Sequence, residues 1–328
     1  MTNAALLGSF GDVGGGPLVF RNKLINGGMA VDQRNAGATQ TFTAAAALAY
    51  SVDRWYGYCT GANATGARIA GTGSQFAYRF TGAASVTAIG FAQRIEQLNS
   101  YSLAGQTATL SVDLANSLLT TVTWTAYYAN TADTFGSLAS PTKTSIATGT
   151  FTVTSTVTRY QAQITVPAAA TTGIEILFTV GAQTSGTWTI QNAQLEAGSL
   201  PTPFEQLLYS QTLSLCQRYY IGLYGRTSGT TVFGQGLSES ATLGSCSFGF
   251  FPTSMRVQPA ASIGAGLKLY GTTGVATTND YSSISINSDR SSLTSGCIYF
   301  AFTGAYVGGS FLAYTATTGI QVAFNAEL

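Results

Sequence analysis

The chain has 328 residues, of which only 8% are charged, with 14 Lys or Arg against 13 Asp or Glu and no histidine. An average soluble protein carries about 25% charged residues, whereas the apolar share of 45% is ordinary. A neutral surface rich in hydroxyl groups is therefore expected. This composition excludes Ser–His and Cys–His catalysis and His-ligated zinc, and a net charge of +1 gives no electrostatic footprint for nucleic acid. No apolar stretch approaches the ~18 residues of a membrane-spanning helix.

Residues 1–19 are predicted to form a flexible arm, because glycines precede Pro17 and leave the backbone unrestrained. The arm is either a disordered terminus or a tether that orders against a partner. In the second case Leu6, Leu7 and Phe10 are its anchors for attachment. The first residues lack a basic segment before their apolar part, so no secretory signal is expected. We therefore expect a cytoplasmic origin.

Short β-strands are predicted from residue 20 to residue 202. Apolar residues alternate with Thr, which is typical of antiparallel strands with one solvated face. The β-branched Thr side chain suits strand geometry while its hydroxyl group stays hydrated. The predicted strands are 75–80, 107–114, 121–128, 149–157 and 174–180. Many short strands with Gly or Ser turns predict a β-sandwich or jelly roll.

One short connecting helix is predicted in the segment 203–220. Apolar residues recur there at helical spacing after Ser210, which suits an N-cap. Thr202 and Glu205 also match a capping box, so an earlier start stays open.

The remaining residues, 221–328, predict a second β-sandwich. Its predicted strands are 232–237, 243–251, 260–269, 281–286, 297–303 and 320–324. Aromatic residues are so dense in this part that we expect some of them to be buried between identical subunits. The overall expectation is an all-β, trimeric protein with one connecting helix.

The cysteines show no CxxC spacing and predict buried free thiols rather than a disulfide framework. Cys246 and Cys297 lie in one region and could pair if their Cα atoms approached within about 7 Å. The other two cysteines are Cys59 and Cys216.

Four separated segments resemble, in this order, a family of bacteriophage and prophage virion proteins described as tail fibre or receptor-binding proteins. They read FRNKLINGGMAVDQRN (20–35), SVDRWYGY (51–58), QRIEQLNSYSLAGQTATLSVDL (93–114) and TWTIQNAQLEAGSLPTPFEQLLYSQTLSLCQRYY (187–220). The resemblance implies a jelly-roll domain similar to carbohydrate-binding modules over residues 20–202 and a C-terminal β domain. It also implies a homotrimer in the virion, assembled in the host cytoplasm and then extracellular. Asp32 stands where the family usually has Trp, so no aromatic contact is expected there.

Several residues of these segments are expected to be structural. Trp55 shares a strand face with Cys59 and is predicted to lie in the core. Rare charges in the segments are expected to form buried ion pairs or loop-pinning hydrogen bonds rather than a catalytic site, namely Asp53, Arg54, Arg94 and Glu96. The stretch 194–196 is predicted to close the first sandwich.

Enzymatic activity is not expected. The acids are scattered, no lysine lies in an S-x-x-K setting, and the glycines at 14–16 lack the features of a phosphate-binding loop. No cofactor, metal or nucleic acid is therefore implied.

Carbohydrate binding is the more favoured chemistry, because aromatic rings pack against the C–H faces of sugars. Tyr56, Tyr58, Arg79 and Tyr127 are predicted on outward strand faces beside Thr and are the candidate residues. The same tyrosines could instead face a neighbouring subunit or cover a sheet edge.

Two functions remain open. The first is a fibre protein that attaches the virion to a neutral host-surface glycan, with little dependence on salt. The second is a purely structural fibre or decoration protein of capsid, collar or tail without a ligand of its own.

Overall fold

The computed structural model describes residues 20–44, 48–225, 231–240, 242–264, 267–271, 281–286, 291–302, 310–315 and 319–328. The predicted arm, with Leu6, Leu7 and Phe10, lies outside the described residues. The chain divides into two compact units, one of Met1–Thr212 with Leu328 and one of Leu213–Glu327.

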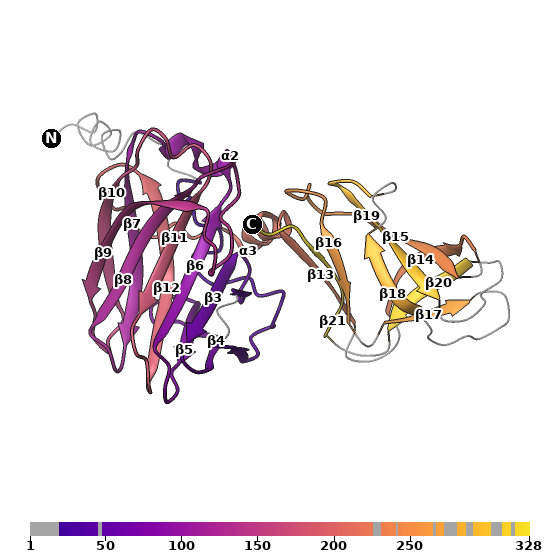
Figure 1. The fold of residues 1–328 in the computed structure, drawn as a ribbon, viewed down its shortest axis with the longest axis horizontal. Coiled ribbons are helices and arrows are strands. Elements are labelled where there is room, and N and C mark those ends of the chain that lie inside the picture. The colour runs from indigo at the N-terminus through magenta and orange to yellow at the C-terminus, as the bar shows by residue number, and fades with distance from the viewer. Residues whose placement is uncertain are drawn as a thin grey trace, which may run out of the picture. The chain divides into compact units, whose positions relative to one another are not determined.

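Two six-stranded antiparallel sheets form the first unit (Figure 1). We name one the Tyr58 sheet; its strands in spatial order are β2 (Ala49–Tyr50), β3 (Trp55–Thr60), β6 (Ala88–Ile95), β11 (Ile174–Val180), β8 (Thr121–Ala129) and β9 (Lys143–Thr152). We name the other the Arg79 sheet; its strands are β1 (Gln40–Phe42), β4 (Ala64–Ala70), β5 (Phe76–Thr81), β12 (Thr187–Ala197), β7 (Thr107–Asn116) and β10 (Thr158–Thr165). Strands that are neighbours in space are mostly far apart in the sequence.

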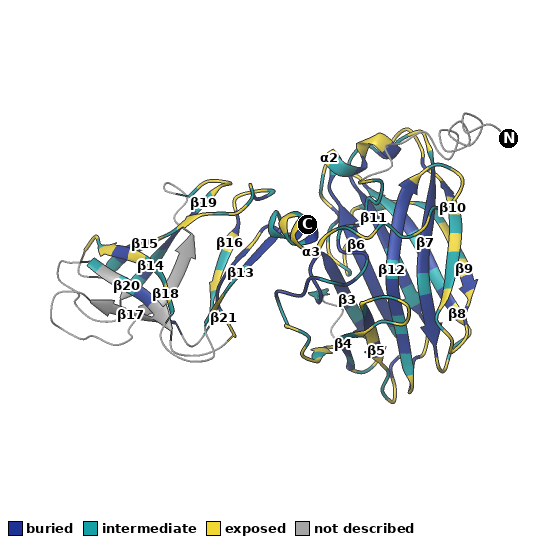
Figure 2. Cartoon of the chain, turned by 180° about the vertical axis from the view of Figure 1, so that it is seen from behind, coloured by how far each residue is buried: buried dark blue, intermediate teal, exposed yellow. Residues whose placement is uncertain are grey.

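One apolar core lies between these two sheets. Trp55 of β3 stacks on Phe91 of β6 with ring centroids 4.9 Å apart, and Phe91 also stacks on Tyr78 of β5 at 5.0 Å. Phe80 and Trp188 stack at 5.5 Å within the Arg79 sheet. The prediction that Trp55 is a core residue is confirmed, since its side chain is completely buried. Figure 2 shows the central strands of this unit coloured largely as buried.

The period-two pattern located four strands of the first unit closely. The observed β11 has the predicted bounds 174–180, and β5, β7 and β8 lie within two residues of theirs. The strand predicted at 149–157 is instead β9, which begins at Lys143. The first half of β9 contains no buried residue and no regular apolar alternation, so its sequence carries no strand signal.

The connecting helix is α3 (Tyr209–Gln217), so the later of the two predicted starts is the closer one. Thr202 and Glu205 do not cap a helix: the Thr202 hydroxyl donates to Glu196 at the end of β12, and the Glu205 carboxylate accepts from the backbone N–H of Asn22. The other helical elements in the described part of the chain are the short α2 (Gln97–Ser100) and η1 (Tyr101–Leu103).

A second β-sandwich forms the second unit. Its three-stranded sheet contains β13 (Tyr220–Gly225), β21 (Gly319–Asn325) and β16 (Ala260–Ile263). Its six-stranded sheet contains β17 (Leu267–Gly271), β20 (Ser310–Thr315), β14 (Thr231–Ser238), β15 (Leu243–Phe250), β19 (Ser295–Phe302) and β18 (Tyr281–Ile286). Val322 and Phe324 of the smaller sheet share a core with Ile298 and Phe300 of the larger one. The predicted strand 260–269 is in fact two strands.

All four cysteines are buried free thiols, as predicted. Cys246 of β15 lies opposite Ile298, and Cys297 of β19 lies opposite Ser247, so the two thiols are on neighbouring strands without forming a disulfide. Burial, with a smaller effect of Cys297, raises the pKa of the Cys246 thiol to about 12. This thiol therefore stays protonated at neutral pH.

The protein is all-β, with antiparallel sheets paired into sandwiches, as the sequence predicts. Within the part of the chain that the structure describes, no helix is long and apolar enough to cross a membrane.

Candidate functional site

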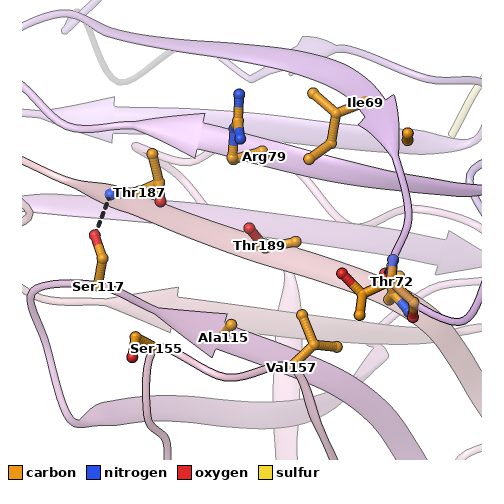
Figure 3. Close-up of a pocket in the computed structure, with 11 residues that line it drawn as sticks. Ile69, Thr72, Arg79, Ala115, Ser117, Ser155, Val157, Thr187 and Thr189 are labelled. Carbon is orange, nitrogen blue, oxygen red and sulfur yellow. Dashed lines mark hydrogen bonds between the residues drawn. The ribbon is translucent and has the colours of Figure 1, made fainter.

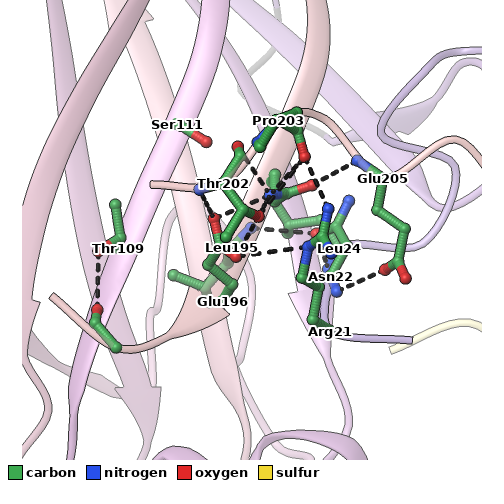
Figure 4. A network of polar contacts seen from close by, with 12 residues as sticks. Arg21, Asn22, Leu24, Thr109, Ser111, Leu195, Glu196, Thr202, Pro203 and Glu205 are labelled. Atoms are coloured by element: carbon green, nitrogen blue, oxygen red, sulfur yellow. Dashed lines mark hydrogen bonds and ion pairs between the residues drawn. The ribbon is translucent and has the colours of Figure 1, made fainter. Parts of the chain in front are cut away.

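Residues of the first and fourth sequence segments meet in a network that we name the polar clamp (Figure 4). The side-chain oxygen of Asn22 accepts hydrogen bonds from the backbone N–H groups of Leu24 and Leu195, both at 3.0 Å. Its side-chain nitrogen donates to the carbonyl of Ala193 at 3.0 Å. The polar clamp consists of Arg21, Asn22, Gln194, Glu196, Thr202 and Glu205.

Glu196 is the buried carboxylate of the polar clamp. It accepts hydrogen bonds from the backbone N–H of Thr202 at 2.8 Å, from the Thr202 hydroxyl at 2.6 Å and from Gln194 at 2.8 Å. Arg21 lies 3.6 Å from it. The clamp thus joins the start of the first unit to the end of β12, which agrees with the closing role predicted for 194–196.

Residues of the first, second and third segments form another buried polar network. Asp53 accepts hydrogen bonds from the backbone N–H and the side chain of Gln33, at 2.9 and 2.5 Å. Burial raises the pKa of the Asp53 carboxyl group above its ordinary value. Arg54 donates to the carbonyl of Arg94 at 2.5 Å. These contacts confirm the prediction of loop-pinning hydrogen bonds.

Asp32 also has a structural role. Its carboxylate accepts from the backbone N–H groups of Asn35 at 3.0 Å and Gly37 at 2.7 Å, and it lies 3.9 Å from Arg68. Asp32 therefore stabilises the loop before β1.

The outer face of the Tyr58 sheet carries aromatic and hydroxyl side chains in rows across the strands. Tyr58 of β3, Gly90 of β6, Thr179 of β11 and Thr123 of β8 are partners in one row. Side chains on this face that remain partly exposed form what we name the tyrosine face, namely Tyr58, Thr123, Thr125, Tyr127, Leu177 and Thr179.

The ring of Tyr58 lies against the backbone of β6 where Gly90 has no side chain. A Cβ atom at Gly90 would overlap the Tyr58 ring, with Cε1, Cζ and the hydroxyl oxygen nearest to it. Burial raises the pKa of Tyr58 to about 12, and Tyr127 and Glu175 add to the shift. Tyr58 is thus a neutral aromatic group held close to the sheet at neutral pH.

Tyr127 is held by a charged cluster at one edge of the tyrosine face. The Lys143 ammonium group lies 4.3 Å from the centre of the Tyr127 ring. Lys143 also forms an ion pair with the fully buried Glu175, whose other oxygen lies 2.9 Å from Arg94 Nε. Both cations therefore have a carboxylate partner, which fixes the side chains around Tyr127.

Tyr56 shares this side of the sheet but is not exposed, contrary to the prediction. Its side chain is completely buried. The Tyr50 ring lies edge-on at 5.9 Å, and the Arg94 guanidinium lies 5.2 Å from the Tyr56 ring centre. The sequence alternation placed Tyr56 on the outward side correctly, but groups from β2 and β6 cover it.

A groove of about 580 Å³ continues the tyrosine face toward the other end of the sheet. It shares Thr123 and Thr179 with that face. The groove is open, and its volume lies within the range of small-ligand sites. Its lining residues are Ala88, Leu119, Thr120, Thr121, Thr123, Thr179, Val180 and Gly181.

Arg79 lies elsewhere. It belongs to β5 and is the register partner of Thr189 on β12, on the outer side of the Arg79 sheet (Figure 3). The structure therefore separates the four predicted residues: Tyr58 and Tyr127 remain together, Tyr56 lies beneath, and Arg79 is on the opposite sheet. The order of the strands in the two sheets decides which of these residues share a surface. Alternation along the sequence carries no information on that order.

The described residues contain no group of three or more Cys, Asp or Glu side chains that could hold a metal ion. The acids of the first unit described above act in structural contacts, as Glu175, Glu196, Asp32 and Asp53 show. The groove itself is lined by apolar and hydroxyl side chains without a carboxylate.

No family model matches the sequence, and no curated protein matches it. Solved structures with similar folds include a family 4 carbohydrate-binding module, 15% identical with a TM-score of 0.35 over 53% of this chain and 98% of that chain. Another is the family 11 carbohydrate-binding module of a Clostridium thermocellum cellulosomal cellulase, 11% identical with a TM-score of 0.32 over 52% and 100%. A third is the enzymatically active domain of tailspike protein 4 of bacteriophage CBA120, 18% identical with a TM-score of 0.32 over 44% and 19%.

Proposed function

We propose that the first unit binds a neutral glycan along the tyrosine face and the groove that continues it. The observation that carries this proposal is the placement of Tyr58, whose ring lies against the strand at Gly90 while the residue stays partly exposed. A ring held in this way loses little conformational entropy when a sugar C–H face packs on it. Threonine hydroxyls on neighbouring strands supply hydrogen bonds to sugar hydroxyl groups.

The charge distribution favours a neutral ligand on this face. Lys143 and Arg94 are both paired with Glu175, and the groove is lined by uncharged side chains. A charged ligand would have to compete with these ion pairs. Binding of a neutral glycan is expected to change little with ionic strength.

The order of the four sequence segments supports a more specific proposal. We place the protein in a bacteriophage virion as a fibre protein of the tail fibre type that mediates attachment to the host surface. It would be assembled in the host cytoplasm and then reach the extracellular medium with the particle. Residues 1–19 are proposed to attach it to other virion proteins.

Exposed apolar residues of the second unit support the proposal of a homotrimer. Phe250 is 88% exposed, Leu237 63% and Val232 53%. Apolar side chains exposed to this degree are typical of surfaces that associate. A closed assembly of identical chains would bury them.

Substitutions in the tyrosine face test the glycan proposal. Tyr58→Ala and Tyr127→Ala are expected to weaken binding on a glycan array by about tenfold, which corresponds to about 1.4 kcal/mol. Tyr101→Ala is the matched control, because Tyr101 is 61% exposed and lies outside the face. Unchanged binding by both folded variants would refute the proposed site.

The alternative is a purely structural fibre or decoration protein. The two proposals differ in one measurement, namely whether the purified protein adsorbs to host cells and competes with infection. Competition that is lost in Tyr127→Ala supports the receptor-binding role. A protein that neither adsorbs nor competes would be structural.

A further inference from the structure

A second pocket, of about 300 Å³, lies on the outer side of the Arg79 sheet. It is formed where β5, β12 and β7 run side by side, and the segment before β10 contributes Ser155 and Val157 (Figure 3). The pocket is separate from the tyrosine face, which belongs to the other sheet. Its lining residues are Ile69, Ala70, Thr72, Arg79, Ala115, Ser117, Ser155, Val157, Thr187, Thr189 and Gln191.

The Arg79 side chain makes no hydrogen bond or ion pair with any residue that the structure describes, and the residue is exposed. This distinguishes it from Arg94 and Arg159, which are paired with Glu175 and Asp113 at 2.9 and 3.0 Å. A guanidinium group has five N–H donors in a fixed planar arrangement that fits the two oxygens of a carboxylate or a phosphate. The pocket thus presents an unused anion-binding group.

The hydroxyl groups around Arg79 are also unused. Those of Thr72, Ser155, Thr187 and Thr189 form no hydrogen bond with any described residue. The Thr187 backbone N–H donates to the Ser117 hydroxyl at 2.8 Å (Figure 3). The side-chain amide of Gln191 accepts from the Thr72 backbone N–H at 3.1 Å and donates to the Thr72 carbonyl at 2.8 Å. The four unbonded hydroxyl groups are available to a ligand that carries several hydroxyls of its own.

Two further features complete the chemistry of the pocket. Ile69 and Val157 supply apolar surface for the C–H side of a small ring. The nearest outer-face acid on β7, Asp113, is neutralised by Arg159 at 3.0 Å and accepts from Asn192 at 2.7 Å, so it does not oppose an incoming anion.

We infer that this pocket is a second binding site, specific for an acidic sugar, in which Arg79 binds the carboxylate or phosphate group and the surrounding hydroxyls bind the ring. This inference does not rest on the proposed role of the tyrosine face. It gives the first unit two sites of different chemistry, one on each sheet. Only the second site depends on an unpaired charge.

Ligand titrations followed by NMR test the inference on the full chain. The probes are glucuronate and glucose 6-phosphate, with glucose and inorganic phosphate as comparisons. We expect the wild-type protein to bind one or both acidic sugars more tightly than glucose and than inorganic phosphate, with affinity that falls as salt is added. Binding of neither acidic sugar at about 10 mM would overturn the inference.

Variants assign the binding to the pocket. Arg79→Gln is expected to weaken acidic-sugar binding by about tenfold or more, because a hydrogen bond to a charged group is lost. Arg79→Lys keeps the charge but loses the planar donor arrangement and should give an intermediate affinity. Lys23→Gln is the matched control, since it lowers the net charge by the same amount outside the pocket.

Tyr127→Ala separates this site from the tyrosine face. It should leave glucuronate binding unchanged while it weakens neutral-glycan binding. An equal loss in Lys23→Gln and Arg79→Gln would show a general charge effect and overturn the inference. Inorganic phosphate that binds as tightly as both acidic sugars would also overturn it, because the pocket would then not recognise the ring.

Discussion

Gly90 is the residue that gives Tyr58 its position. Because the ring occupies the space of the missing side chain, Gly90→Ala is expected to push Tyr58 away from the sheet. The expected result is weaker glycan binding, close to that of Tyr58→Ala, and a loss of stability of about 1–3 kcal/mol from overpacking. Glycan-array binding and urea unfolding measure the two effects.

Gly222→Ala is the control for this substitution. A Cβ atom at Gly222 meets its nearest neighbour, Ile320 Cδ1, at 3.4 Å, which is an ordinary contact. Glycan binding by Gly90→Ala at the wild-type level would show that the ring position does not matter.

Tyr58 also predicts a pH dependence. Its pKa of about 12 in the folded protein lies above the ordinary tyrosine value of about 10. Its contribution to stability is therefore complete below about pH 10 and is lost as the pH rises toward about 12. The free energy of unfolding should fall more steeply over this range in the wild type than in Tyr58→Phe, which cannot ionise.

Glycan binding itself should not vary between about pH 6 and about pH 9, because the chain has no histidine and Tyr58 remains protonated there. Parallel unfolding curves of wild type and Tyr58→Phe up to about pH 12 would contradict the assigned pKa.

Among the elements, the end of β12 depends on the polar clamp. Asn22→Ala removes three hydrogen bonds and leaves two backbone N–H groups and one carbonyl without that partner. We expect a loss of about 2–3 kcal/mol in the free energy of unfolding, measured with urea and tryptophan fluorescence. Asn63→Ala is the control, since Asn63 accepts a single exposed hydrogen bond from Ala44, and it should cost less than about 1 kcal/mol. Equal losses in the two variants would mean that the clamp adds no stability.

The strands differ in how far the sequence predicts them. In β11 every second residue is apolar and faces the core, so Ile174, Ile176 and Phe178 locate the strand and its orientation. In β4 the residues ATGARIA alternate weakly, and the strand was not predicted. Pairing with β5 over six positions holds it, and that information lies outside the segment.

The candidate site could be predicted from the sequence only in part, for the same reason. Alternation within β3 and β8 identified Tyr58 and Tyr127 as outward residues, and both lie on the tyrosine face. Alternation within β5 identified Arg79 as outward too, but β5 belongs to the other sheet. Packing of the whole core sets which strands become neighbours, so alternation predicts which residues point outward but not which of them share a surface.

On the scale of the whole molecule, the proposed trimer makes a prediction about Phe250. This residue is the most exposed large apolar side chain among those described. If it lies between subunits, Phe250→Ser should convert a particle of about three times the 34.0 kDa chain mass into smaller species, as measured by mass photometry. Tyr209→Ser is the control, because Tyr209 is 59% exposed in the first unit. A wild-type protein with the mass of a single chain would contradict the trimer.

The polar clamp has a mechanical consequence for a protein that is pulled at both ends. It connects Asn22 directly to Leu195, and Arg21 donates to the carbonyl of Pro203 at 2.9 Å. Tension applied to the chain on either side of the first unit would therefore pass through these few bonds. The intervening sandwich, which carries both proposed ligand surfaces, would bear no load until the clamp had broken.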